Sequence, residues 1–317
     1  MHLYLIQFIK MLQNQLITLK PTRLFILIIA CMPVLHLMAQ KSDNIGLAYK
    51  SKTMEDRWEL GRQNHKGLFV ITPYRPVYVT AGRWSNSPNT KPTSENPAYT
   101  LPFRINYNNY EAKFQLSFKT KIARSLFWGN GDIWVAYTQK AHWQLYNEKL
   151  SRPFRELNYE PEVFLNFATN YKLLGLKGRM LGIIFNHQSN GKTLPLSRSW
   201  NRVIVQAGFE KNNWQLMLRV WHRLKDEVDE NPAIADYVGR SEATIIFNAG
   251  KCQFSSVLTH SLKLKNGGRG SAQVNWVFPI INNFRGQIQL TEGYGETMID
   301  YNHRQTTIGV SVSLVEW

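Results

Sequence analysis

The sequence has little cysteine and almost no long apolar run, and each absence narrows the class of protein. Two cysteines occur in 317 residues, Cys31 close to the start and Cys252 far along the chain. Once an N-terminal leader is removed, Cys252 stands alone, which excludes an internal disulfide and argues against a zinc site made of cysteine and histidine. Beyond residue 39 no apolar run approaches the length of a membrane-spanning helix.

Acidic residues are scarce relative to basic ones. The chain has 22 Asp and Glu against 38 Lys and Arg, so its formal net charge is +16. A basic surface permits binding to nucleic acid or to anionic lipid. The basic residues are scattered, without a Lys/Arg run or a nucleic-acid-binding motif. The sequence therefore favours an anionic membrane surface, and we expect no nucleic-acid partner.

The N-terminus has the pattern of an export signal. Lys20 and Arg23 precede the apolar run 24–38, and Ala39 is a small residue suited to a cleavage point. The apolar run is short for a membrane-spanning helix. We therefore predict a signal peptide at residues 1–39.

From residue 67 onward, short segments alternate apolar and polar residues, and aromatic residues make up 13% of the chain. Segments of about nine to eleven residues suit tilted strands that cross a bilayer. Short turns alternate with longer loops, which is typical of a membrane barrel. The pattern predicts an all-β fold, a twelve-stranded antiparallel transmembrane β-barrel over residues 67–317, preceded by a polar N-terminal arm over 40–66. The expected strands are 68–81, 107–121, 131–146, 158–171, 174–187, 201–210, 213–224, 236–248, 251–261, 271–279, 284–293 and 305–315.

The last segment shows the alternation most clearly. Ile308 and Val310 share one face, whereas Thr307 and Ser311 share the other. A soluble exported β-sandwich could show the same alternation, and extraction without detergent would reveal it. The export signal, the even strand spacing and the terminal aromatic residue Trp317 favour the barrel. A terminal strand that ends in an aromatic residue resembles the sorting signal of bacterial outer-membrane barrels.

The stretches 185–191 and 197–202 hold the candidate chemistry. His187 and Ser189 are two residues apart, so in a strand they point to the same face, roughly 6.6 Å apart along the backbone. If the next strand pairs antiparallel, Asn201 returns beside His187. A nucleophile, a base and an orienting residue together follow the logic of a hydrolytic triad.

The parity of these residues predicts where the triad lies. His187 shares the parity of Phe185, and Asn201 shares that of Val203, so both should lie on the outer wall at the rim of the apolar band. The ester bond of a glycerolipid lies at that depth. An asparagine can hold the imidazole without placing a carboxylate beside hydrocarbon, where a charge is costly. The sequence has no Gly-x-Ser-x-Gly elbow, so it is not an ordinary α/β-hydrolase.

No pair of backbone donors for an oxyanion hole is evident, and a cation could serve instead. The loop 190–200 is rich in oxygen atoms, from Asn190, Thr193, Ser197 and Ser199. These atoms could hold a hard metal such as Ca²⁺. The loop has no carboxylate, so this pattern alone is a weak indication.

Gln139 interrupts an apolar row. It shares a face with Val135 and Tyr137 in the segment 131–146. An amide that faces hydrocarbon with its hydrogen bonds unmade is costly. A second subunit presenting its own Gln139 would supply a partner. The alternative is a register shift or a local bulge that turns Gln139 inward.

These residues are similar to the signature of the bacterial outer membrane phospholipase A family. The segments 186–191 and 197–202 carry the likeness, which runs from about residue 67 to the C-terminus. Further segments that resemble the family are Tyr137–Lys140, Pro153–Glu156, Asn158–Pro161, Gly293–Glu296 and Ile299–Asn302.

The resemblance implies a calcium-dependent homodimer in the outer membrane of a Gram-negative bacterium. By family pattern it would hydrolyse the sn-1 or sn-2 acyl esters of phospholipids, and also lysophospholipids. Ser189 would be the nucleophile, His187 the general base and Asn201 the residue that orients it, with an acyl-serine intermediate. The alternative is a catalytically inactive barrel, a channel or an adhesin; the presence of the full triad argues against it.

The resemblance also implies the metal ligands and the interface. Calcium would be bound by the main-chain carbonyl of Lys192, the hydroxyl of Ser197 and Ser151 of the partner subunit, and the interface glutamine would be Gln139. Lys192 stands where an arginine is usual, which matters little if only its carbonyl binds metal. Leu194 stands where relatives can carry an acid, which puts any second calcium site in that loop in doubt.

Overall fold

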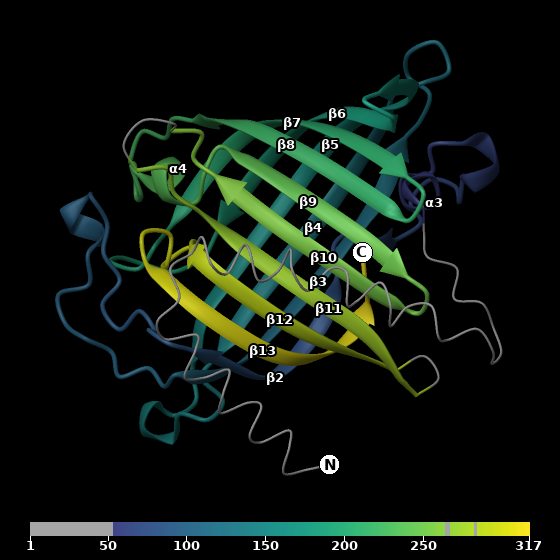
Figure 1. The fold of residues 1–317 in the computed structure, drawn as a ribbon. Coiled ribbons are helices and arrows are strands. Elements are labelled where there is room, and N and C mark those ends of the chain that lie inside the picture. Colours follow the sequence, from purple (N-terminus) through teal and green to yellow (C-terminus); the bar gives the residue numbers. More distant parts are fainter. Residues whose placement is uncertain (1–52, 264–266, 282–283) are drawn as a thin grey trace. The chain divides into compact units, whose positions relative to one another are not determined.

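A computed structural model describes residues 53–263, 267–281 and 284–317, and in it the chain forms a closed antiparallel β-barrel (Figure 1). Neighbours in sequence pair from β2 to β13, and β13 pairs back with β2. The predicted twelve-stranded barrel is therefore confirmed. Its strands are β2 (Val77–Ser85), β3 (Tyr110–Ala123), β4 (Asp132–Trp143), β5 (Phe154–Leu173), β6 (Leu176–Ser189), β7 (Ser199–Lys211), β8 (Trp214–Leu224), β9 (Ser241–Ala249), β10 (Cys252–His260), β11 (Gly270–Ile281), β12 (Phe284–Tyr294) and β13 (Arg304–Val315).

Two strands, β2 and β9, begin well after their predicted starts. The first barrel strand was expected at 68–81 but is β2, because Pro73 and Pro76 lack the N–H groups that a ladder needs. Only the two-residue β1 (Thr72–Pro73) forms before it, paired with β3. The segment expected at 236–248 begins with the short helix α4 (Ile234–Tyr237), and the strand starts only at Ser241.

The segment before the barrel is more ordered than a polar arm. Helix α3 (Met54–Trp58) is capped by Thr53, whose side chain accepts a hydrogen bond from the Asp56 backbone. Met54 and Trp58 are buried in the main apolar cluster of the barrel. The 3₁₀ turn η1 (Arg62–Asn64) follows α3. The predicted signal peptide and residues 40–52 of the predicted arm lie outside the described residues.

The remaining helical elements are short. They are the 3₁₀ turns η2 (Pro97–Tyr99) and η3 (Glu148–Leu150) in the connections between strands. Among the residues that the structure describes, no helix combines the length and hydropathy of a membrane-spanning segment.

The outer wall of the barrel is apolar. Side chains alternate along each strand, and in β6 the exposed residues Leu181, Ile183 and Phe185 alternate with buried ones. The same outward row continues around the barrel through Val79, Leu116, Val135, Val163, Val205, Leu218, Val220, Ile308 and Val310. An apolar exterior of this kind matches the hydrocarbon of a bilayer.

The interior is filled by side chains. At the α3 end, Trp58 packs edge-on against Trp134 and Phe164, with ring centroids 6.0 and 5.7 Å away. Further along, Trp200 and Trp221 pack edge-on at 6.3 Å. These buried aromatic rings argue against an open channel through the barrel.

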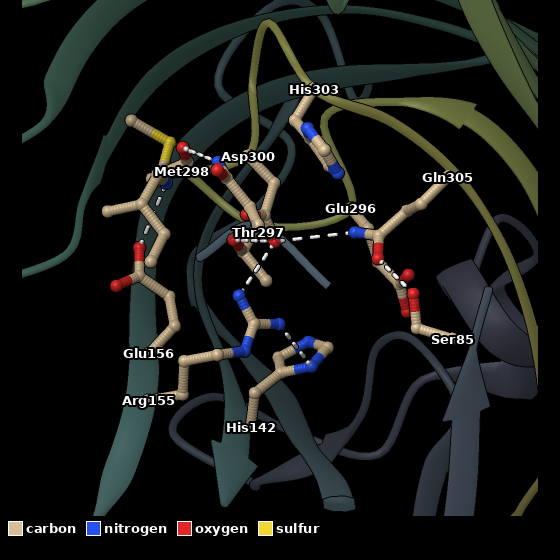
Figure 2. A network of polar contacts seen from close by, with 12 residues as sticks. Ser85, His142, Arg155, Glu156, Glu296, Thr297, Met298, Asp300, His303 and Gln305 are labelled. Atoms are coloured by element: carbon tan, nitrogen blue, oxygen red, sulfur yellow. Dashed lines mark hydrogen bonds and ion pairs between the residues drawn. The ribbon is translucent and has the colours of Figure 1, made fainter. Parts of the chain in front are cut away.

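A network of buried charges crosses the interior at the opposite end (Figure 2). Arg155 Nε donates to Glu111 Oε2 at 2.9 Å, and Arg83 Nη1 donates to Glu111 Oε1 at 2.8 Å. His142 Nδ1 lies 2.7 Å from the same Oε1 atom. Arg155 also reaches Asp300, whose Oδ2 accepts from Nη1 at 2.8 Å. Buried charges are tolerated here because each has an opposite partner.

Asp300 belongs to the connection 295–303, outside the strands. Burial would raise the pKa of its carboxyl, but Arg155 and the hydroxyl of Thr297 outweigh burial and lower the pKa below the ordinary value. Asp300 therefore stays ionised and ties the connection 295–303 to β5.

The long connections meet at one end of the barrel. Those that the structure describes from end to end are residues 86–109, 144–153, 190–198, 225–240 and 295–303. The turns at the other end, such as 174–175 and 212–213, are short. The candidate triad lies at the long-loop end, which in membrane barrels faces the outside.

Candidate active site

Strands β6 and β7 bring two of the three candidate triad residues into contact. Their antiparallel register pairs His187 with Asn201 and Ser189 with Ser199. His187 Nδ1 and Asn201 Oδ1 are 2.8 Å apart. Both side chains continue the outward row of Phe185, and both are half-buried. The site therefore lies on the outer wall, directly beyond the apolar band.

Ser189 lies on the same strand and face as His187. Among the described residues its hydroxyl makes no hydrogen bond to the imidazole. Catalytic hydrogen bonds are often long in the free enzyme and shorten with substrate. The bond to Asn201 occupies Nδ1 of His187 and leaves Nε2 to interact with the serine.

The loop after Ser189 is held by Asn190. Its Oδ1 accepts from the backbone of Arg198 at 3.0 Å, and its Nδ2 donates to the Leu196 carbonyl at 2.8 Å. Gly191 follows at φ +62°, and a Cβ there would lie 3.1 Å from the Tyr159 ring. The Asn190 hydrogen bonds and the left-handed conformation of Gly191 fix the backbone conformation at the two ends of this loop.

Arg198 attaches this loop to the long connection 86–109. Its Nη2 donates to the carbonyls of Tyr99 at 2.7 Å and Thr93 at 3.2 Å. Burial lowers the pKa of Arg198, against the opposing influence of Tyr301 and nearby carboxylates. The connection 86–109, which has no sequence motif, thus buttresses the loop that carries Ser197.

Ser197 and Glu230 bring a hydroxyl and a carboxylate into contact. Ser197 Oγ donates to Glu230 Oε1 at 2.6 Å. The other carboxylate oxygen, Glu230 Oε2, is buried and has no hydrogen-bond partner among the described residues. A buried carboxylate oxygen without a donor suits a hard cation. The described residues contain no group of three or more His, Cys, Asp or Glu that could hold a metal, so hydroxyl and carbonyl oxygens would have to complete such a site.

Among the described residues, the remaining predicted site residues make no hydrogen bond to the triad. Ser151 is exposed after η3, with φ +58° and ψ +32°. Lys192 is half-buried, and its backbone N–H donates to Asn190 Oδ1 at 3.3 Å. Gln139 pairs in regular register with Leu116 and Tyr159, so no bulge turns it inward.

One contact of the site has no counterpart in the sequence-based prediction. Asn201 Nδ2 donates to Asp226 Oδ1 at 2.8 Å. The signal that could have suggested it is the register of β7 with β8, which pairs Asn201 with Leu224 and places Asp226 two residues beyond. Glu230, in the same connection, is not among the residues predicted for the site.

Comparison with known proteins gives a consistent result. The family model described as "Phospholipase A1" matches residues 54–314. A phospholipase A1 of Salmonella typhimurium is 36% identical over 252 residues, covering 80% of this chain and 84% of the relative. A putative phospholipase A1 of Neisseria meningitidis is 37% identical over 262 residues, covering 80% of this chain and 68% of the relative.

Solved structures agree with the sequence relatives. Outer membrane phospholipase A from Escherichia coli superposes with a TM-score of 0.70 at 34% identity, covering 78% of this chain and 94% of the other. The Salmonella typhi outer membrane phospholipase, described as a dimer with bound calcium, gives a TM-score of 0.71 at 35% identity, covering 80% and 95%.

Proposed function

The chain belongs to the outer membrane phospholipase A family and is a phospholipase of the Gram-negative outer membrane, and we propose that it cleaves acyl esters through Ser189, His187 and Asn201 as a calcium-dependent homodimer. The observation that carries the proposal is the 2.8 Å contact between His187 and Asn201 on the lipid-facing wall, beside Ser189. Phospholipids and lysophospholipids of the surrounding leaflet are the substrates.

The proposed reaction uses the two nitrogens of His187 for different tasks. Asn201 Oδ1 accepts a hydrogen bond from the protonated Nδ1, so Nε2 is free to take the proton of Ser189. The serine oxygen bonds to the ester carbonyl carbon, and His187 passes the proton to the departing alcohol oxygen of the lipid. Water, deprotonated by His187, then bonds to the acyl carbon of the acyl-serine. The bond to Ser189 Oγ breaks, His187 returns the proton to that oxygen, and the fatty acid leaves.

Calcium fits the oxygens beside the triad. Ser197 Oγ and the partnerless Glu230 Oε2 support such a site in this chain. We propose that these two groups hold the ion together with the Lys192 carbonyl and Ser151 of the partner subunit. When bound, calcium polarises the ester carbonyl and stabilises negative charge on its oxygen.

A dimer completes the proposed site. Ser151 is exposed at the long-loop end and is available to another subunit. In a two-fold dimer the same patch faces itself, so Gln139 would meet its own copy within the apolar wall. A monomer would lack one metal ligand, and activity would therefore rise with dimer formation.

The proposal is tested by fatty acid release from phospholipid micelles. Refolded wild-type protein is compared with Ser189→Ala, each with calcium and with chelator. We expect calcium-dependent release by the wild type and a loss on the order of 10⁴-fold in the variant. Cross-linking checks the dimer: a cross-linked dimer no more active than dilute monomer would contradict control by dimerisation.

Release that persists in Ser189→Ala would contradict the assignment of the nucleophile. Release by the wild type that is indifferent to chelator would contradict the calcium site. An unfolding measurement on both proteins, with equal midpoints expected, ensures that lost activity is not lost structure.

A further inference from the structure

We propose that Asp226 is a positioning residue for this hydrolysis, because it fixes the Asn201 amide in the orientation that makes His187 a base. The inference rests on the proposed function of the triad. It adds a fourth member, supplied by the connection 225–240, to a triad otherwise confined to β6 and β7.

The geometry is a continuous chain of two hydrogen bonds. Asp226 Oδ1 accepts from Asn201 Nδ2 at 2.8 Å, and Asn201 Oδ1 lies 2.8 Å from His187 Nδ1. Asp226 is half-buried, next to Leu224 at the end of β8. The amide of Asn201 is therefore held on both of its polar atoms.

The donors and acceptors of these three side chains allow one arrangement of hydrogen bonds. An ionised carboxylate only accepts hydrogen bonds, whereas an amide both donates and accepts. Asp226 therefore faces Nδ2, and Oδ1 must face His187. That oxygen accepts only from a protonated Nδ1, so Nε2 carries the lone pair that the serine proton needs. Without Asp226, the amide could rotate by half a turn and present Nδ2 to the imidazole.

Asp226 also brings a negative charge to the triad without placing a carboxylate against hydrocarbon. Asp226 belongs to the connection 225–240, and Asn201 lies between its carboxylate and the imidazole of His187. Other titratable residues on the neighbouring elements are Tyr159 on β5, His222 on β8, Lys192 after β6 and Lys225 and Glu227 beside Asp226. Among the described residues, Asp226 is the acid that bonds to the triad.

Two substitutions distinguish the effect of the Asp226 charge from its effect on the orientation of the Asn201 amide. Asp226→Asn keeps an acceptor but removes the charge. A lost negative charge makes protonation of His187 less favourable, so the acidic limb of kcat/KM should move to lower pH by about half a unit. Asp226→Ala removes the acceptor as well, and kcat should fall about tenfold with KM little changed. Glu227→Gln is the matched control, because it removes a neighbouring exposed charge, and it should leave both quantities unchanged.

A reciprocal exchange gives the sharpest test. Asn201→Asp alone places two carboxylates side by side, and its activity should fall well below that of the wild type. Asn201→Asp combined with Asp226→Asn puts the donating amide at 226 and the accepting carboxylate at 201, where it also accepts from His187 Nδ1. The kcat of this double variant should exceed that of Asn201→Asp about tenfold or more. Equal activity of the single and double variants would overturn the proposal.

Wild type and Ser189→Ala are measured in the same assay of fatty acid release. If Ser189→Ala is as active as the wild type, the proposed function itself fails. If Ser189→Ala is inactive while Asp226→Asn and Asp226→Ala match the wild type in kcat and pH profile, only the role of Asp226 fails.

Discussion

Two polar clusters lie at the long-loop end of this barrel, on opposite sides of the same wall. On the outside, His187, Asn201 and Asp226 form a half-buried chain of two hydrogen bonds at the rim of the apolar band. Inside, Arg155 and Asp300 belong to a buried network of ion pairs (Figure 2). The outer cluster leaves bonding positions free for substrate, whereas the inner cluster satisfies its charges with one another. The difference indicates that chemistry and framework are assigned to opposite faces of the wall.

The segments that resemble the phospholipase family also fall into an outer and an inner group. Segments 186–191 and 197–202 carry the triad, whereas Pro153–Glu156 and Ile299–Asn302 supply Arg155 and Asp300 to the interior. Some segments that resemble the family thus belong to the buried ion-pair network of the barrel interior. The following predictions test this division, beginning with the largest effect.

Two histidines allow the division to be tested with one kind of substitution. His187→Ala removes the proposed base and should lower fatty acid release on the order of 10⁴-fold without changing stability. His142→Ala breaks the 2.7 Å contact with Glu111 and should cost roughly 1.5–3 kcal/mol of unfolding free energy. Activity per folded His142→Ala molecule should stay near that of the wild type. Urea unfolding in micelles measures the stability of each variant, and the release assay measures its activity. A His142→Ala variant that is stable but inactive would contradict the assignment of chemistry to the outer face and framework to the inner face.

Arg155 is the centre of the inner network. Arg155→Met leaves Glu111 and Asp300 buried without their partner, so the unfolding free energy should fall by about 3–5 kcal/mol. Arg155→Lys keeps the charge but loses the planar fork, and its loss should be smaller. Urea unfolding of the three proteins measures the order. If Arg155→Met leaves the free energy of unfolding unchanged, the buried network does not stabilise the barrel.

Gln139 sharpens the account of the outer wall, because it is polar there without being part of the triad. Gln139→Leu should weaken dimer association by about 1 kcal/mol, close to fivefold, since polar contacts in lipid contribute modestly. Analytical ultracentrifugation in detergent measures the association. Val220→Leu, an outward substitution on β8, is the control. An unchanged dimer in Gln139→Leu would place the interface elsewhere.

The inner network also predicts a pH dependence. The pKa of Asp300 is lowered in the folded state by Arg155 and Thr297, which outweigh burial. Its contribution to stability is therefore present above the ordinary aspartate pKa and is lost as pH falls through the lower folded value. Asp300→Asn should flatten the acid side of the stability profile by at most about 1.4 kcal/mol per pH unit. Identical acid slopes in urea unfolding at several pH values would contradict this.

Periodicity was enough to predict the barrel and the outward position of His187. The parity that His187 shares with Phe185 fixes its face, and the antiparallel return brings Asn201 beside it. Both depend only on regular backbone geometry, which a sequence pattern reports directly.

Irregular parts escaped prediction for physical reasons. The apolar stretch 68–71 resembles a strand, yet Phe69 and Ile71 are each 70% exposed and the ladder begins later. Helix α3 is too short to show a helical period. Asp226 and Glu230 lie in a connection whose course depends on tertiary contacts, so spacing along the sequence carries no information about their partners.

Covalent trapping of the nucleophile tests the central claim most directly. Wild-type protein and His187→Ala are treated with an alkyl sulfonyl fluoride in micelles with calcium, and the modified residue is located by peptide mass mapping. The account predicts one modified residue, Ser189, in the wild type and almost no modification in His187→Ala. A label on another residue, or full hydrolytic activity after Ser189 has been blocked, would contradict it.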